Sequence, residues 1–216
     1  MRRTRVKICG LTDPADAAAA VRAGADAVGV VLADGPRRLT LDAAERVLAE
    51  VPPMVARVGV FVDAPEALVA EAVRRLGLTA VQFHGAEPPE ACASCVAPVI
   101  KAFRVREGFS AHGIDPYRRS AAAVLLDTFV EGVAGGTGRT FPWERFRDSL
   151  PEGLPVIVAG GLDPVNVGSA VRALRPYAVD VSSGVEELPG AKDHVKVEAF
   201  VAAVRNADSE MRRARA

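Results

Sequence analysis

The sequence lacks the features that would point to an unusual partner or cell compartment. Its 216 residues carry 27 basic and 27 acidic side chains, so the formal net charge is zero and no overall field attracts a polyanion. No apolar run reaches the length of about 18 residues that predicts a membrane span. The basic start Met1-Arg2-Arg3 leads into a strand-like segment instead of the apolar stretch of a signal peptide. We therefore expect a cytoplasmic protein that binds neither nucleic acid nor a membrane.

Aromatic residues and cysteine are also scarce. Aromatic residues make up only 5% of the chain, while 50% is hydrophobic, a composition that favours an ordinary α/β interior. The three cysteines, Cys9, Cys92 and Cys95, cannot all pair, and without an export signal they are expected to be thiols. Cys92 and Cys95 have C-x-x-C spacing, but no second pair of ligands accompanies them, so neither a zinc nor a redox site is predicted.

Short apolar runs of the β type recur along the chain and predict its fold. They are continuous in Val, Ile and Leu instead of alternating with polar residues, which is typical of parallel strands covered on both faces. Helical stretches lie between them, and several begin with Pro, which suits the first helical position. The predicted strands are 6–9, 27–32, 56–62, 80–84, 99–105, 123–127, 156–159 and 178–182. The predicted helices are 14–23, 41–50, 65–76, 88–96, 109–119, 142–150, 164–174 and 193–205.

This series of β/α units predicts an α/β protein, a single-domain (β/α)8 TIM barrel over residues 1–205. Residues 206–216 are polar and charged, and we expect them to form a frayed C-terminal tail. A doubly wound open sheet is the alternative, but no Gly-x-Gly-x-x-Gly follows the first strand. The barrel is therefore the preferred fold.

In a TIM barrel the active site forms at the carboxyl ends of the strands, so the residues that end each strand are candidates for chemistry. The first strand ends in Cys9 and the sixth in Asp127, and these two form the candidate acid–base pair. A thiol at that place would face the pocket, where a nearby cation could favour the thiolate. A carboxylate after an apolar run is costly unless it is solvated, paired or functional. The alternatives are a packing role for Cys9 and a turn cap for Asp127.

Glycine and serine end the seventh and eighth strands. Gly160-Gly161 and Ser182-Ser183-Gly184 stand where barrels frequently bind a phosphate with backbone amides. Either segment alone could be a simple turn, but both together favour a phosphate site. The loop Gly135-Gly136-Thr137-Gly138 after Asp127 could close over a ligand.

Seven segments, in order over nearly the whole chain, form a specific series. They are Val6–Thr12 (VKICGLT), Gly24–Gly29 (GADAVG), Val81–Gly85 (VQFHG), Leu126–Thr128 (LDT), Gly135–Gly138 (GGTG), Ala159–Leu162 (AGGL) and Asp180–Glu186 (DVSSGVE). In these segments the chain resembles the phosphoribosylanthranilate isomerase family of tryptophan biosynthesis.

This resemblance implies a barrel that converts N-(5-phosphoribosyl)anthranilate into 1-(2-carboxyphenylamino)-1-deoxyribulose 5-phosphate by an Amadori rearrangement, with no metal or redox cofactor. Asp127 matches the general acid that protonates the ring oxygen, and Cys9 matches the base that removes the proton from C2. Arg37 matches an arginine that meets the anthranilate carboxylate. The family usually has Ser-Pro-Arg at this place, whereas this chain has Gly35-Pro36-Arg37 followed by Arg38, so either Arg37 or Arg38 could meet the carboxylate. The residues predicted to bind substrate are Arg37, Gln82, His84, Gly160, Gly161, Asp180, Ser182, Ser183 and Gly184.

Two other classes of function stay open at this point. A carbon–carbon lyase or synthase acting on a sugar phosphate would use a catalytic lysine at a strand end, and Lys7 and Lys101 lie in strands. A non-catalytic phosphate-binding barrel would leave Cys9 and Asp127 unexplained. In every case the expected partner is a small phosphorylated molecule, and the protein is expected to be a monomer or a homodimer.

Overall fold

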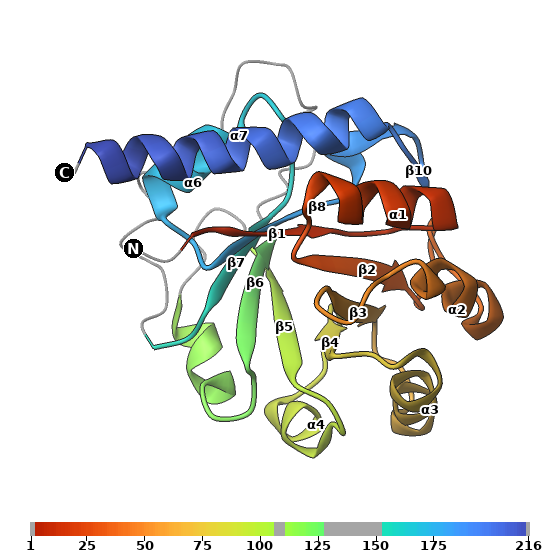
Figure 1. Ribbon diagram of the computed structural model, residues 1–216. Coiled ribbons are helices and arrows are strands. Elements are labelled where there is room, and N and C mark those ends of the chain that lie inside the picture. Colours follow the sequence, from red (N-terminus) through yellow and green to blue (C-terminus); the bar gives the residue numbers. More distant parts are fainter. Residues whose placement is uncertain (1–2, 106–110, 128–152, 215–216) are drawn as a thin grey trace.

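A computed structural model describes residues 3–105, 111–127 and 153–214. In these ranges eight parallel strands form a closed barrel in chain order, with β1 next to β8, and helices cover its outside (Figure 1). The strands are β1 (Arg5–Ile8), β2 (Ala27–Val31), β3 (Ala56–Phe61), β4 (Ala80–Phe83), β5 (Val99–Arg104), β6 (Ala123–Asp127), β7 (Val156–Ala159) and β8 (Ala178–Val181). The helices are α1 (Pro14–Ala23), α2 (Leu41–Ala49), α3 (Glu66–Leu76), α4 (Pro89–Ser94), α6 (Val167–Leu174) and α7 (His194–Arg213), with 3-10 turns η1 (Ala111–Tyr117) and η3 (Ser183–Val185).

The predicted barrel is confirmed, and each strand boundary differs from its prediction by one residue at most. The helices begin and end where local chemistry dictates. Asp13 caps α1 by accepting a hydrogen bond from the Ala15 amide at 2.7 Å, and Gly24 ends the helix with φ +96°. The helix predicted from residue 164 begins later, at Val167, because the Asp163 carboxylate accepts the amides of residues 165 and 166 and holds them in a turn. The predicted helix 142–150 and the loop Gly135–Gly138 lie outside the described residues, as does the start of the segment 109–119.

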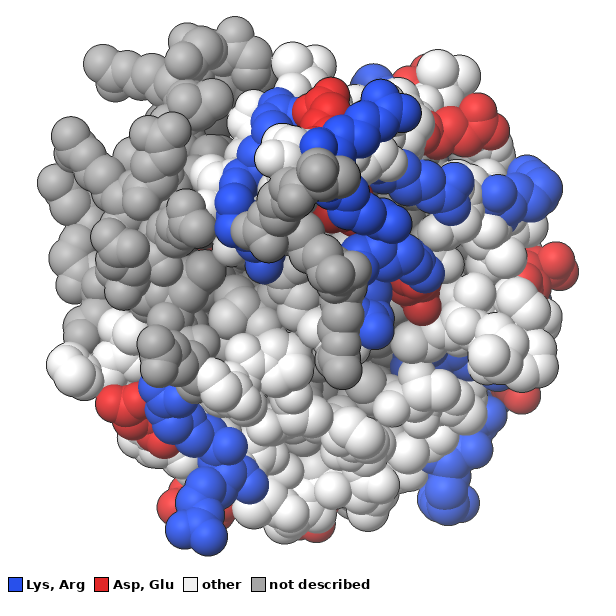
Figure 2. Space-filling view, turned by 60° about the vertical axis from the view of Figure 1, so that its left-hand side comes forward, with Lys and Arg blue, Asp and Glu red and all other residues white. Residues whose placement is uncertain are grey.

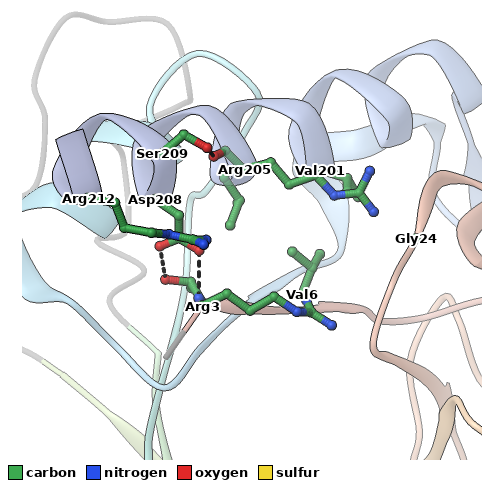
Figure 3. Close-up of a pocket in the computed structure, with 10 residues that line it drawn as sticks. Arg3, Val6, Gly24, Val201, Arg205, Asp208, Ser209 and Arg212 are labelled. Carbon is green, nitrogen blue, oxygen red and sulfur yellow. Dashed lines mark hydrogen bonds between the residues drawn. The ribbon is translucent and has the colours of Figure 1, made fainter. Parts of the chain in front are cut away.

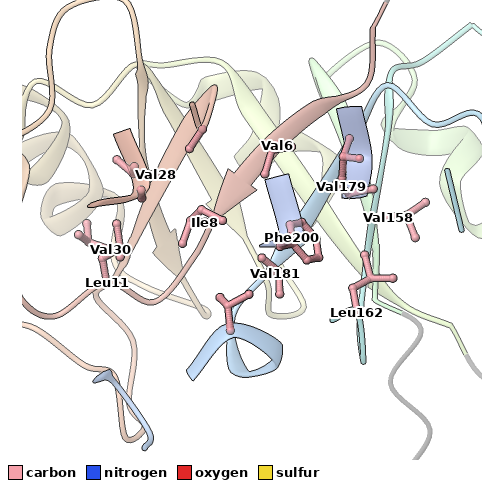
Figure 4. Close-up of a cluster of buried hydrophobic side chains, with 14 of the residues drawn as sticks. Val6, Ile8, Leu11, Val28, Val30, Val158, Leu162, Val179, Val181 and Phe200 are labelled. Atoms are coloured by element: carbon pink, nitrogen blue, oxygen red, sulfur yellow. The ribbon is translucent and has the colours of Figure 1, made fainter. Parts of the chain in front are cut away.

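Two apolar layers position the site. The larger one lies between the strands and the helices, where Val6, Ile8, Val28 and Val30 pack in one continuous cluster with Phe200 of α7 (Figure 4). The smaller one fills the barrel itself with mostly small side chains, namely Ala102, Ala123, Leu125, Ile157, Ala159 and Ala178. Because successive residues of a strand face opposite sides, Leu125 facing inward also turns Asp127 inward.

The C-terminal segment differs from its prediction. Helix α7 continues through Arg213 and buries Ala207, Asp208 and Met211, so the expectation of a frayed tail is wrong for residues 206–213. The Asp208 carboxylate accepts hydrogen bonds from the amide of Thr4 at 2.7 Å and from its hydroxyl at 2.8 Å (Figure 3). These contacts lie beside a cavity of about 290 Å³ between α7 and the start of β1. In this segment the buried side chains recur every three or four residues along the helix, a pattern that its overall polar composition did not indicate.

Replacing Asp208 by Ala is expected to destabilise the protein by about 1–3 kcal/mol, because a buried amide and hydroxyl would lose their acceptor. Urea unfolding measures the loss. Glu210→Ala is the matched control on the same helix, since the Glu210 side chain is 61% exposed in its pair with Arg172, and such pairs contribute little. Equal destabilisation by the two changes would show that the contact between Asp208 and Thr4 does not fasten α7.

The surface carries both signs of charge. On the face seen in Figure 2, basic side chains gather over the upper part with acidic ones among them, and much of the lower part is uncharged. Among the described helices, none is both long and apolar enough to cross a bilayer.

Candidate active site

Cys9 and Lys7 lie inside the barrel on the same side of β1. A Cβ atom at Gly29 of β2 would lie 2.8 Å from the Cys9 sulfur and 3.2 Å from the Lys7 ammonium, so Gly29 leaves the room that both side chains occupy. The Cys9 amide donates to the carbonyl of Val181 at 2.8 Å, which fixes the residue between β1 and β8. Lys7 precedes Cys9 by two residues, so it lies deeper in the barrel on the same face of the strand.

The Lys7 ammonium is tied to Asp180, with 3.0 Å between Nζ and Oδ1 and both side chains almost fully buried. Burial lowers the pKa of Lys7, but the Asp180 carboxylate and the Cys9 thiol outweigh this and raise it above its ordinary value. A lysine held in its charged form is a poor nucleophile for a Schiff base. Asp180, predicted to bind substrate, contacts Lys7 inside the barrel, and its contact with substrate stays a prediction.

Lys101 points to the other face of the wall. Its strand neighbours Ile100 and Ala102 pack in the barrel interior, whereas the Lys101 ammonium lies 2.9 Å from Glu87 and 2.7 Å from the carbonyl of Gly85. Neither strand lysine therefore offers the free amine at the barrel mouth that the lyase alternative needs.

The protonation of Cys9 differs from the expectation for a thiolate. Burial raises the pKa of the Cys9 thiol, and the Asp180 carboxylate adds to the rise, while Lys7 and Lys192 oppose it. The nearby cations that the sequence led us to expect are present, but burial dominates. At neutral pH the protonated thiol is the favoured form.

Asp127 ends β6 and forms a chain of polar contacts with the end of β4. Its Oδ2 atom lies 3.5 Å from His84 Nε2, and His84 Nδ1 lies 3.1 Å from the side-chain nitrogen Nε2 of Gln82. The side chains of His84 and Asp127 are 23% and 24% exposed, so both reach the barrel mouth. Gln82 is only 2% exposed, and among the described residues its Oε1 atom has no hydrogen-bond partner. Gln82 contacts His84, and its predicted contact with substrate stays a prediction.

The loops after β7 and β8 are packed against each other. A Cβ atom at Gly184 would lie 1.9 Å from the carbonyl oxygen of Leu162, so only glycine permits this approach. Gly160 and Gly161 have φ values of +88° and +62°. Gly161 and Ser183 are exposed, and within the described ranges their amides have no hydrogen-bond acceptor. Two loops thus present backbone donors side by side, as an anion site requires.

Arg37 turns toward the same strand ends, whereas Arg38 turns to solvent and pairs with Asp34. A Cβ atom at Gly10 would lie 2.5 Å from Arg37 Cδ and 2.8 Å from Ser182 Oγ, so Arg37 passes directly beside the residue after Cys9. The side chain of Arg37 is 22% exposed. Of the two candidate arginines, only Arg37 lies at the site.

Two charged residues that the sequence analysis did not assign to the site, Glu186 and Lys192, are buried. They lie on a two-stranded antiparallel hairpin, β9 (Glu186–Leu188) and β10 (Ala191–Lys192), that was not predicted. Burial raises the pKa of Glu186, but hydrogen bonds from Arg37 and Lys192 outweigh it and lower the pKa to about 2. The Pro189-Gly190 pair between the strands is a turn signal that could have revealed the hairpin.

Cys92 is buried on α4, on the outside of the barrel, and burial raises its pKa to about 11. Within the described part of the chain, no group of three or more His, Cys, Asp and Glu side chains could hold a metal ion. The C-x-x-C spacing thus falls on a helix that packs against the wall.

Comparison with known proteins identifies the family. The family model described as N-(5'phosphoribosyl)anthranilate (PRA) isomerase matches residues 6–203. An N-(5'-phosphoribosyl)anthranilate isomerase of Pseudomonas fluorescens (strain SBW25) is 47% identical over 212 residues, covering 98% of this chain and 100% of the relative. The crystal structure of phosphoribosyl anthranilate isomerase from Thermotoga maritima superposes with a TM-score of 0.83 at 40% identity, covering 94% of this chain and 99% of that one. A structure of such an enzyme in complex with reduced 1-(o-carboxyphenylamino)-1-deoxyribulose 5-phosphate superposes with a TM-score of 0.80 at 38% identity, with coverage of 94% and 99%. The chain belongs to the N-(5'-phosphoribosyl)anthranilate isomerase family.

Proposed function

We propose that the protein converts N-(5-phosphoribosyl)anthranilate into 1-(2-carboxyphenylamino)-1-deoxyribulose 5-phosphate, an aldose–ketose isomerisation of tryptophan biosynthesis. The observation that carries the proposal is that two candidate catalytic side chains and two loops with exposed amides lie at the same end of the barrel. Cys9 at the end of β1 and Asp127 at the end of β6 face inward from different parts of the wall, separated by β7 and β8. The loops that follow β7 and β8 supply exposed amides between them.

The reaction needs one group that donates a proton and another that accepts one. Asp127 donates its proton to the ring oxygen, so that the C1–O bond breaks and the anthranilate nitrogen forms a Schiff base with C1. Cys9, in the minor fraction of the enzyme in which its thiol is deprotonated, then removes the proton from C2, which leaves an enolamine that tautomerises to the ketone. Because the two groups lie on different parts of the barrel wall, one can serve as the acid and the other as the base for the same sugar. Each such group typically contributes roughly 10²–10⁴-fold in rate.

The two ends of the substrate carry negative charge, and the site offers donors for each. The phosphate is held by the amides of Gly161 and Ser183, with Gly160, Ser182 and Gly184 shaping the loops. Arg37 meets the anthranilate carboxylate, and His84 holds the Asp127 carboxyl group in place. A small phosphorylated molecule is thus the ligand. A monomeric or homodimeric state and a cytoplasmic location stay predictions.

The deciding experiment follows the fluorescence of freshly prepared phosphoribosylanthranilate. Addition of the purified protein is expected to accelerate its loss over spontaneous decay, with the rearranged product appearing in equal amount by chromatography. A Cys9→Ser/Asp127→Asn double variant controls for contaminating enzyme. Release of carbon dioxide or cleavage of a carbon–carbon bond would favour the lyase reading. Binding without turnover would favour a phosphate-binding barrel.

The phosphate assignment predicts that Gly161→Val weakens binding of a phosphate-bearing product analogue by about tenfold or more. A Cβ atom at Gly161 would meet no atom of the described residues within 4 Å, so the new side chain would stand where the anion is proposed to bind. Gly153→Val is the matched control, because Gly153 also has a positive φ, of +82°, and precedes β7 at the opposite end of the barrel. Inhibition constants measured for both variants test the assignment. Unchanged inhibition of the folded Gly161→Val protein would remove the phosphate from this loop.

A further inference from the structure

Glu186 is the meeting point of the charged groups beside Cys9. Its Oε1 atom accepts hydrogen bonds from Arg37 Nε at 2.7 Å, from Lys192 Nζ at 2.7 Å and from the Gly190 amide at 3.3 Å. Its Oε2 atom accepts one from Arg37 Nη2. The Glu186 side chain is 5% exposed, and that of Lys192 is 0% exposed. A buried carboxylate with this many donors is fixed in place.

The Glu186 carboxylate fixes the plane of the Arg37 guanidinium. Two parallel hydrogen bonds occupy one edge of the guanidinium, and this fork geometry allows a single orientation. Among the described residues, no acceptor is recorded for Arg37 Nη1, and the side chain retains 22% exposure. One edge of Arg37 is therefore held by Glu186, while Nη1 is left without a partner among the described residues.

The same carboxylate also reaches the loop after β8. The Lys192 ammonium that binds Glu186 donates a second hydrogen bond, at 3.1 Å, to the carbonyl of Ser182. Ser182 begins the segment whose amides are assigned to the phosphate. A single chain of contacts therefore runs from the arginine on the β2 side to the phosphate loop and sets the spacing between them.

The charge of the cluster favours an anion. Arg37 and Lys192 are cations and Glu186 is an anion, which leaves one positive charge uncompensated next to the Cys9 thiol. A carboxylate delivered by the substrate would neutralise it, whereas an uncharged aromatic ring would leave it desolvated.

We propose that Glu186 is a positioning residue that holds the free edge of Arg37 toward the ring carboxylate of the substrate and thereby makes the enzyme prefer an arylamine that carries this group. The proposal rests on the proposed function. It assigns to Glu186 no contact with the substrate, because its effect passes through Arg37.

The test compares two inhibitors, the reduced product analogue with its ring carboxylate and the same molecule with an unsubstituted phenyl ring. In Glu186→Gln we expect the preference for the carboxylated inhibitor to fall by about 10- to 100-fold, the range for loss of a charge-assisted hydrogen bond. Affinity for the phenyl compound should change by less than about threefold, and KM should rise while kcat stays within about threefold. Glu187→Gln is the matched control, since the neighbouring Glu187 is exposed on the same strand, and it should keep the full preference.

A second variant guards against misfolding. Glu186→Gln leaves the buried Lys192 without its partner, whereas Glu186→Leu/Lys192→Met removes both buried charges together, a change that proteins often tolerate. This double variant should also lose the preference. If it folds and keeps the preference, or if Glu186→Gln keeps it while Arg37→Ala loses it, the positioning role of Glu186 is wrong and the isomerase function still stands. Absence of turnover in the unaltered protein would instead overturn the proposed function.

Discussion

Asp127→Asn is expected to lower turnover by roughly 10²-fold or more with little change in substrate affinity. The amide keeps the size of the carboxyl group and can still meet His84, which lies 3.5 Å from Asp127. It has no acidic proton to give to the ring oxygen, so ring opening should fail while binding persists. Steady-state measurement of kcat and KM, with the inhibition constant of a product analogue, separates the two effects.

Asp42→Asn provides the control for Asp127. Asp42 lies on α2, where its side chain is 71% exposed in a pair with Arg75, so its loss should leave both constants unchanged. More than a tenth of normal turnover in Asp127→Asn would show that another group is the acid.

Cys9→Ser is expected to abolish most of the activity, because a hydroxyl is far too weak a base near neutral pH. The direction of the pKa shift adds a pH dependence. Since burial raises the pKa of Cys9, little thiolate is present in the free enzyme at neutral pH, and kcat/KM should increase with pH into the alkaline range. A pH profile of kcat/KM checks this rise, and full activity in folded Cys9→Ser would return Cys9 to a packing role.

Cys92 and Cys95 serve as internal controls for the thiol. Cys92→Ser/Cys95→Ser should retain activity, because both residues belong to the α4 region outside the barrel. A substrate analogue should protect Cys9 from iodoacetamide without changing the labelling of the other two. Protection of all three thiols would mean that the analogue alters the whole fold instead of covering one residue.

The barrel could be predicted from the sequence because each strand is buried on both faces and therefore reads as a short continuous apolar run. Cys9 and Asp127 could be predicted to face the barrel interior because each ends a predicted strand. The predictions failed where tertiary contacts decide. The polar segment 206–213 is helical, and its Asp208 carboxylate accepts hydrogen bonds from Thr4, a residue remote in sequence. Likewise, no local pattern revealed that Glu186 would join Arg37, or that burial would outweigh two lysines at the Cys9 thiol.

The seam between β1 and β8 joins the two ends of the chain. Lys7 meets Asp180 across 173 positions of sequence, and Thr4 meets Asp208 across 204. During synthesis the first strand therefore emerges from the ribosome long before its second neighbour exists. The edge of β1 stays open until β8 has been translated, and an exposed edge of this kind can pair with other chains. For this protein, the interval between the translation of β1 and of α7 is the period of greatest risk of misassembly.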